Sequence, residues 1–132
     1  PESGLADIEI IASLALIESA GFRLSNDLGQ SVSFYLDVGS HTLQLDRTKS
    51  GKDSFSEKFP GIHTANRHSS SDMLSIRAII DASSIEIFVD EGSNIFTEIF
   101  FPDRNYSQVE LIGNTEVLKN ISGSMWEIQR IW

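Results

Sequence analysis

The stretch that decides the fold reads LSIRAIIDASSIEIFVDEGSNIFTEIFFP and runs from Leu74 to Pro102. Apolar residues alternate with other residues on both sides of Ala82-Ser83, a pattern typical of two antiparallel strands joined by a two-residue loop. In that register the facing apolar pairs are Ile80 with Ile85, Ala78 with Ile87, and Ile76 with Val89. The stretch therefore predicts a β-hairpin with one side on an apolar core.

A third strand is expected after a turn at Glu91-Gly92-Ser93. This turn would add to the apolar side Ile95, Thr97, Ile99 and Phe101. The opposite side would then carry Arg77, Ile79, Glu86, Phe88, Phe96, Glu98 and Phe100. Such a face is more aromatic than a sheet surface that meets water, so something is expected to cover it. The cover is either a terminal strand or loop of this chain or another domain.

Short alternating runs separated by Gly, Ser, Asn and Asp extend over the whole chain, which indicates an all-β fold. The expected strands are Leu5–Leu14, Gly21–Ser25, Ser31–Val38, Thr42–Arg47, Leu74–Asp81, Ser84–Asp90, Ile95–Phe101, Ser107–Ile112, Glu116–Ile121 and Met125–Trp132. The segment Leu5–Ala20 also fits a helix. Thr48–Ser71 is expected to be a long connection with one short strand near Phe55–Phe59. We predict a two-sheet antiparallel β-sandwich, of jelly-roll or concanavalin-like type, with about ten strands.

Length and composition suit one globular domain over residues 1–132, with 40% hydrophobic and 22% charged residues. The net charge of −9 argues against binding to nucleic acid or to an anionic membrane, whereas neutral sugars stay compatible. The chain contains no cysteine, so disulfides and thiolate metal sites are excluded. It opens at Pro1 rather than Met, and we expect it to be a fragment whose N-terminal part is missing.

Two motifs resemble the C-terminal part of glycoside hydrolase family 32. DASSIEIFVDEG at residues 81–92, followed by Thr97 and by IFFP at residues 99–102, is similar to the signature D-x-S-S-(V/I)-E-(V/I)-F-x-x-x-G…T…F-P. LDRTKSG at residues 45–51 is similar to the element L-D-R-(S/T)-x-S-G, and many members end as this chain does, in Ile-Trp. Ala82 departs mildly from the family, in which arginine is commoner at that position.

The resemblance implies a C-terminal β-sandwich module of an invertase, levanase, inulinase or sucrose-6-phosphate hydrolase. The catalytic residues of these enzymes lie on an N-terminal five-bladed propeller, whose N-D-P-N-G, R-D-P and E-C motifs do not occur here. The resemblance therefore assigns no catalytic residue and no cofactor to this chain. It implies the propeller of the same polypeptide as the partner, and a homo-oligomer is compatible with it. A parent enzyme that acts on fructan is expected to be secreted, periplasmic or at the cell surface, and a sucrose-6-phosphate hydrolase to be cytoplasmic.

A site for chemistry within the chain itself has one candidate. Glu86 and Glu98 are expected to face one another on neighbouring strands, with Cβ atoms about 4.5–5.5 Å apart, near the carboxyl separation of a retaining glycosidase. Arg77, which lies diagonal to Glu86, favours instead an ion cluster inside a domain contact. We therefore expect a non-catalytic module that supports the catalytic domain, and the alternative is a carbohydrate-binding module.

Sugar contact is predicted at aromatic residues that have polar groups beside them. Tyr106 is expected at the surface, whereas Trp126 and Trp132 also fit core or interdomain packing. The histidines are expected to face solvent without a carboxylate partner: His41, His63 and His68. No metal is predicted, because the acidic loop residues lack the D-x-D-x-D-G spacing of a calcium loop.

Overall fold

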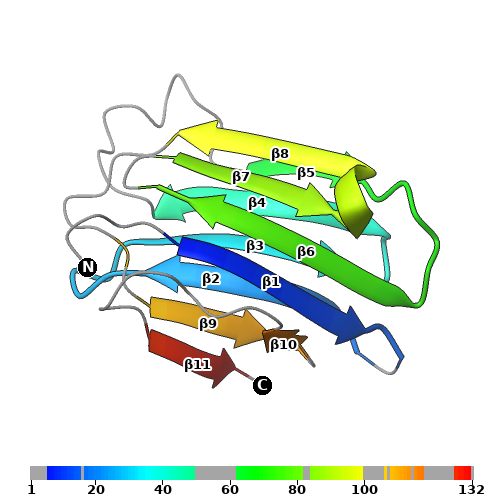
Figure 1. The fold of residues 1–132 in the computed structure, drawn as a ribbon, viewed down its shortest axis with the longest axis horizontal. Helices are drawn as coiled ribbons and strands as arrows, with labels where there is room; N and C mark the ends of the chain where they lie inside the picture. Colours follow the sequence, from blue (N-terminus) through cyan, green and yellow to red (C-terminus); the bar gives the residue numbers. More distant parts are fainter. Residues whose placement is uncertain are drawn as a thin grey trace.

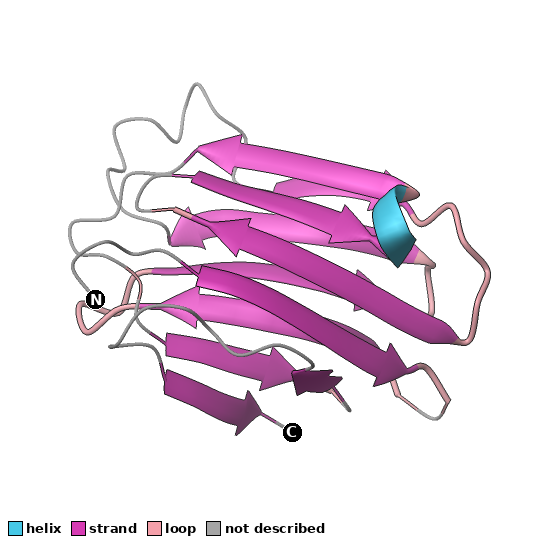
Figure 2. Cartoon of the chain, in the orientation of Figure 1, coloured by secondary structure: helices cyan, strands magenta, loops and turns pink. Residues whose placement is uncertain are grey.

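The fold is a sandwich of two β-sheets, one in front of the other (Figure 1). The computed structural model describes residues 6–15, 17–49, 62–81, 84–99, 106, 108–113, 115–117 and 127–131. Within these residues it contains eleven strands and one single-turn 3₁₀ helix (Figure 2). None of the helical structure in this part of the chain is long and apolar enough to cross a membrane.

One sheet has five strands and the other has six. The five-stranded sheet has the order β10 (Thr115–Val117), β1 (Ala6–Ser13), β6 (Met73–Ile80), β7 (Ser84–Val89) and β8 (Asn94–Ile99). The six-stranded sheet has the order β11 (Glu127–Ile131), β9 (Gln108–Ile112), β2 (Ser19–Ser25), β3 (Ser31–Asp37), β4 (Thr42–Lys49) and β5 (Ile62–Asn66). Neighbouring strands pair antiparallel except β11 and β9, which run parallel. The predicted two-sheet sandwich is confirmed, with this one parallel pair as a departure.

The core lies between the sheets, because alternate residues of each strand point inward. In β3 the buried residues are Val32, Phe34 and Leu36, each no more than 1% exposed. From the other sheet, Ile76 of β6 and Ile87 of β7 are no more than 1% exposed. Burying one such side chain contributes about 1.5–3 kcal/mol, so this double layer of apolar residues is what holds the sheets together.

The predicted hairpin is confirmed in its register. β6 pairs with β7 so that Ile76 faces Val89 and Ile80 faces Ile85. The N-terminal segment is a strand and not a helix, since β1 pairs with β6 along its whole length, from Ala6 to Ser13. A strand partner on each side, β6 and β10, uses the backbone groups that a helix would bond internally.

The predicted connection Thr48–Ser71 contains a strand that the sequence did not indicate. β5 occupies Ile62–Asn66 and pairs with β4, so that Leu45 faces His63 and Leu43 faces Ala65. It is the last strand of its sheet, and its residues are only exposed or half-buried. An edge strand of this kind needs few apolar residues, and its sequence shows no apolar alternation. The strand predicted near Phe55–Phe59 lies outside the described residues.

Candidate functional site

The outward face of the five-stranded sheet combines apolar and charged side chains in cross-strand rows. Strand pairing places Glu9, Arg77, Phe88 and Ile95 next to one another, one from each of β1, β6, β7 and β8. Phe88 is half-buried and Ile95 is 60% exposed. An aromatic ring beside a guanidinium and an exposed isoleucine is unusual on a sheet surface that meets only water, so this face is the candidate site.

A hollow of about 490 Å³ opens on this face. Its lining residues are Glu9, Ser75, Arg77, Ile79, Phe88 and Glu91. Three strands contribute the floor and the rim, and the 3₁₀ helix η2 (Asp90–Gly92) contributes Glu91. The volume falls within the range of about 300–1,000 Å³ that is usual for small-molecule pockets.

Arg77 is tied to β1 across the strand boundary. Its Nε donates to Asp7 Oδ1 at 3.2 Å and its Nη2 donates to Asp7 Oδ2 at 2.8 Å. The hydrogen bonds that Arg77 donates to Asp7, with the charges of Asp7 and Glu9, raise the pKa of Arg77 above its ordinary value. These two hydrogen bonds therefore fix the direction of the Arg77 guanidinium beside Phe88, while the side chains of Arg77 and Asp7 stay open to solvent.

The turn that carries Glu91 has an uncommon backbone. Asp90 and Glu91 have φ of 52° and 62°, in the left-handed region, and Gly92 follows at 102°. For a residue other than glycine this conformation costs about 1–2 kcal/mol. Neighbouring groups must therefore hold the turn in place.

Arg67 holds this turn from inside the protein. Its side chain is 0% exposed, and it donates from Nε to Asp90 Oδ2 at 2.7 Å and from Nη2 to Asp90 Oδ1 at 2.8 Å. Its Nη1 donates to the carbonyl oxygen of Ser71 at 2.9 Å, and its Nη2 also donates to that of Met73 at 3.0 Å. A buried guanidinium whose bonds are made in this way is a rigid support for the turn.

Asn94 and His68 join the same turn to β5. The Asn94 side chain accepts from the backbone N–H of His68 at 2.9 Å and donates to the Asn66 carbonyl at 3.0 Å. The His68 Nδ1 lies 2.7 Å from the carbonyl oxygen of Ser93. The turn is thus connected to both sheets, and the His68 side chain is exposed to solvent, as predicted.

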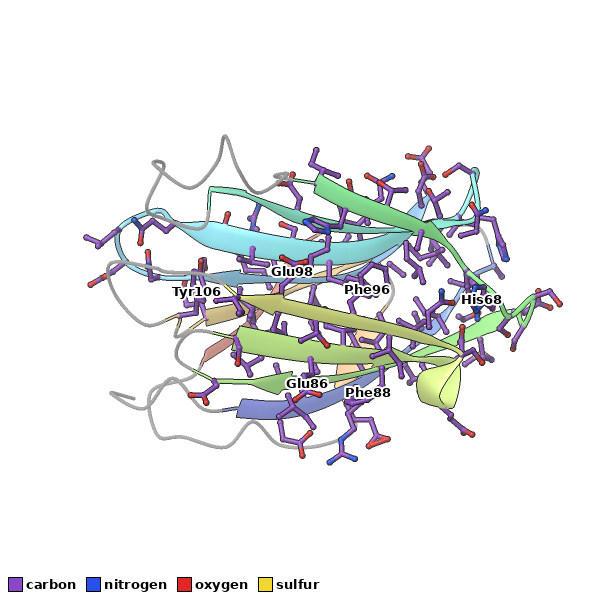
Figure 3. The ribbon with its side chains drawn as sticks, turned by 90° about the horizontal axis from the view of Figure 1, so that it is seen from above. His68, Glu86, Phe88, Phe96, Glu98 and Tyr106 are labelled. Carbon is purple, nitrogen blue, oxygen red and sulfur yellow. The ribbon has the colours of Figure 1, made fainter. Side chains whose placement is uncertain are left out.

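Phe96 and Glu98 do not lie on the outward face where they were predicted. β7 pairs with β8 so that Glu86 faces Thr97, while Phe96 faces Ile87 and Glu98 faces Ile85. Figure 3 shows Phe96 and Glu98 between the sheets and Glu86 and Phe88 on the far side of the five-stranded sheet.

The predicted register of the third strand is therefore wrong by one residue. Four residues, 90–93, connect Val89 to its partner Asn94, where a three-residue turn was expected. A shift of one residue exchanges the two faces of a strand. Ile95 and Ile99 consequently lie on the outward face, at 60% and 56% exposure. Glu86 and Glu98 do not face one another, which removes the geometry of the candidate carboxylate pair.

On the inward side, Phe96 and Glu98 have partners in the other sheet. The ring of Phe96 packs edge-on against Phe34, with centroids 5.0 Å apart. Glu98 Oε2 lies 3.3 Å from His63 Nδ1. His63 therefore has the carboxylate partner that it was predicted to lack.

Of the aromatic residues predicted to contact sugar, Tyr106 belongs to the described part of the chain. Tyr106 is 2% exposed and belongs to the core, so its expected surface position is wrong. The side chains of Trp126, Trp132 and Phe100 lie outside the described residues. His41 is at a turn, where its Nε2 lies 3.0 Å from the Ser69 carbonyl oxygen.

The outward face of the six-stranded sheet is polar by comparison. Arg23 donates two hydrogen bonds to Glu110, at 3.0 and 2.8 Å, and Tyr35 donates to Gln44 at 3.0 Å. The hydrogen bond from Arg23 holds the pKa of Glu110 below its ordinary value. These contacts suit a face in water. In the part of the chain that the structure describes, no group of three or more acidic or histidine side chains could hold a metal ion.

These features define a β-sandwich domain with one polar outer face and one mixed, hollowed outer face. Comparison with known protein families then identifies the family of this domain. The family described as "Glycosyl hydrolases family 32 C terminal" matches residues 1–127. The chain belongs to this family of C-terminal domains, which confirms the resemblance seen in its motifs.

Curated relatives of this chain are named as a levanase, an exo-inulinase and a sucrose-6-phosphate hydrolase. A levanase of Bacillus sp. (strain L7) is 28% identical over 98% of this chain, which spans 14% of the levanase. An extracellular exo-inulinase of Aspergillus awamori is 26% identical over 91% of the chain and 21% of its own length. A sucrose-6-phosphate hydrolase of Escherichia coli is 26% identical over 92% of the chain and 24% of its length. The chain thus spans less than a quarter of these relatives.

The crystal structure of the exo-inulinase from Aspergillus awamori contains the same fold. It matches 87% of this chain and 24% of its own chain with a TM-score of 0.70, at 22% sequence identity. The likeness confirms the β-sandwich architecture independently of the motifs.

Proposed function

We propose that this chain is a non-catalytic module that supports the catalytic domain of a fructan- or sucrose-hydrolysing glycosidase. The outward face of the five-stranded sheet is the surface that meets that domain. The observation that carries the proposal is the contrast between this hollowed, partly apolar face and the polar face of the other sheet. The candidate interdomain residues on this face are Arg77, Glu86 and Phe88, while Phe96 and Glu98 now belong to the space between the sheets.

Exposed apolar residues support this choice of face. Met73 is 46% exposed, Ile79 40%, Ile95 60% and Ile99 56%, and all four lie on the outward side of the five-stranded sheet. Contiguous exposed apolar surface marks contact sites more often than it marks surface in water. A partner that covers these side chains removes them from water and so stabilises the assembled protein.

The relatives supply the class of partner. In each of them the segment similar to this chain is less than a quarter of the protein, and the proteins are named for hydrolysis of levan, inulin or sucrose 6-phosphate. We place the catalytic propeller of the same polypeptide against the outward face. A fructan-cleaving parent is expected outside the cytoplasm, as the name of the extracellular exo-inulinase suggests, and a sucrose-6-phosphate hydrolase inside it.

A carbohydrate-binding function is the second candidate, and the hollow favours it. An aromatic floor at Phe88 with polar neighbours such as Ser75 and Glu91 resembles the composition of sugar sites. In this case the module would hold fructan near the catalytic domain and raise its local concentration.

Hydroxyl-radical labelling tests the first candidate, because it reports the exposure of individual side chains. Met73 and Phe88 are expected to react in the isolated chain and to be protected in the full polypeptide that contains the catalytic domain. Tyr35, on the outward face of the other sheet, is the matched control and is expected to react equally in both. Equal labelling of Met73 and Phe88 in both proteins would contradict the proposal.

Calorimetric titration of the isolated chain with levan, inulin and sucrose tests the second candidate. Saturable heat that disappears in a Phe88→Ala variant would establish a sugar site in the hollow. Absence of heat with all three sugars leaves the supporting role as the function.

A further inference from the structure

An apolar stripe crosses the outward face of the five-stranded sheet diagonally. Phe88 of β7 faces Ile95 of β8, and Ile79 of β6 faces Glu86, so that Ile79 and Phe88 are diagonal neighbours. Ile79 is 40% exposed, Ile95 is 60% exposed, and Phe88 is half-buried. Diagonal neighbours on a sheet are close enough for an aromatic side chain to reach both sides. Ile79, Phe88 and Ile95 therefore form one apolar stripe over three strands.

The hollow opens beside this stripe. Ile79 and Phe88 both line it, and Arg77 lines it as well. The guanidinium of Arg77 is bonded to Asp7, at 3.2 and 2.8 Å, and Asp7 is not a lining residue. Arg77 can therefore offer its methylene stem to an occupant without losing its charge partner.

The polar lining residues suit the rim of a contact. Glu9 is half-buried and faces Arg77 across the strand boundary, and Glu91 is exposed on η2. Protein interfaces have an apolar centre and a polar rim that stays in contact with water. The strongest contributions come from side chains that fill pockets near that centre. The hollow and the apolar stripe together have this arrangement.

The relatives contain enough further chain to cover the face. This chain spans 14% of the levanase, 21% of the exo-inulinase and 24% of the sucrose-6-phosphate hydrolase. A domain joined through the same polypeptide meets the face at a high effective concentration. A contact built on a few apolar side chains is then sufficient to keep the face covered.

We propose that the hollow receives an apolar side chain of the catalytic domain, which packs on Phe88 and is flanked by Ile79 and Ile95. This inference rests on the proposed function, since it names the group that anchors the two domains to one another. An aromatic or branched aliphatic side chain suits this position, because it removes its own apolar surface and that of the stripe from water. The carboxylates of the rim keep their hydration.

Hydroxyl-radical labelling of Met73 in the full polypeptide tests the inference. Met73 lies on the same face, is 46% exposed and does not belong to the apolar stripe. Phe88→Asn makes the floor of the hollow polar, and it is expected to return the labelling of Met73 to the rate of the isolated chain. Phe88→Leu keeps the floor apolar and is expected to keep Met73 protected.

Two controls separate loss of docking from loss of folding. Tyr106, which is 2% exposed, is expected to stay unlabelled wherever the module is folded. Ile95→Ser changes a side chain that is 60% exposed, so it leaves the core intact and is expected to weaken the protection of Met73. This second variant decides the test if Phe88→Asn labels Tyr106.

The rim supplies the matched comparison. The double variant Glu9→Gln/Glu91→Gln is expected to keep Met73 protected, because an apolar anchor does not depend on these charges. The protection is also expected to persist at about 1 M salt, where the Debye length is about 3 Å.

Each result has a separate meaning. If Met73 stays protected in folded Phe88→Asn and in Ile95→Ser, the domain docks without this anchor, and the inference is wrong while the proposed function stands. If Met73 is labelled equally in the isolated chain and in the unmodified full polypeptide, the proposed function fails. If the rim variant or salt abolishes the protection, charge holds the domains together and the inference is overturned.

Discussion

Arg67 shows how much of this fold depends on one polar side chain. It lies with 0% exposure next to a turn that contains two left-handed residues, Asp90 and Glu91. The pair with Asp90 is a buried ion pair, whose loss leaves one charge without its partner in a dry environment. Arg77, by contrast, forms its fork with Asp7 at the surface, where solvent screens the attraction.

Replacement of Arg67 by alanine is expected to lower the free energy of unfolding by about 3–5 kcal/mol, as for other buried pairs that lose one member. Urea unfolding followed by tryptophan fluorescence measures the change. Arg77→Ala is the control, and it is expected to change stability much less. Equal losses for the two variants would show that burial of Arg67 does not set its contribution.

At the scale of elements, β2 and β3 leave no room for a side chain at Gly21. Gly21 of β2 faces Tyr35 of β3, and a Cβ at this position would collide with the carbonyl oxygen of Phe34. The missing side chain is therefore a requirement of the strand pairing at the centre of the six-stranded sheet.

Gly21→Ala is expected to destabilise the protein by about 1–3 kcal/mol or more, because the neighbouring backbone must shift to admit the methyl group. Gly39→Ala is the matched control, since the atom nearest to its Cβ is Asp37 Oδ1, at an ordinary 3.7 Å. Thermal unfolding of both variants, followed by circular dichroism, compares them. A Gly21→Ala variant as stable as Gly39→Ala would contradict the close approach.

The strands differ in how far their sequence predicts them. The hairpin of β6 and β7 was predictable because every inward position on both strands is apolar, while the positions between them include Ser75, Arg77 and Glu86. β8 was placed in the wrong register because its residues 95, 96 and 99 are all apolar, so alternation does not say which face is inside. The length of the turn decides the register, and the turn is bonded to Arg67, which lies 23 residues from Asp90.

The site was partly predictable for the same reasons. Arg77, Glu86 and Phe88 belong to the confirmed hairpin, and the sequence placed them on one outward face. The hollow was not predictable, because it needs Glu9 of β1 and Glu91 of the turn beside Phe88. These contacts follow from strand order and turn conformation, which local sequence does not specify.

The whole molecule has one polar outer face and one outer face that exposes several apolar side chains. When the chain is alone, Ile95 and Ile99 remain exposed on the second face, at 60% and 56%. Two copies that meet through this face would bury these side chains, so the isolated chain is expected to self-associate.

Replacement of Ile95 by serine is expected to reduce this self-association, measured as the weight-average mass in sedimentation equilibrium. Ile62→Ser is the control, because Ile62 is equally open at 52% exposure but belongs to the other sheet. An isolated chain that is monomeric at high concentration, or an equal effect of the two variants, would show that the outward face is not adhesive.

The pair of Glu98 and His63 has a consequence for what such association can become. These residues lie on β8 and β5, each of which is the last strand of its sheet among the described residues. A strand added there would close over the carboxylate and the imidazole that point between the sheets, at a high cost in desolvation. Extension of the sheets by another copy is therefore expected to be costly at the β5 and β8 edges.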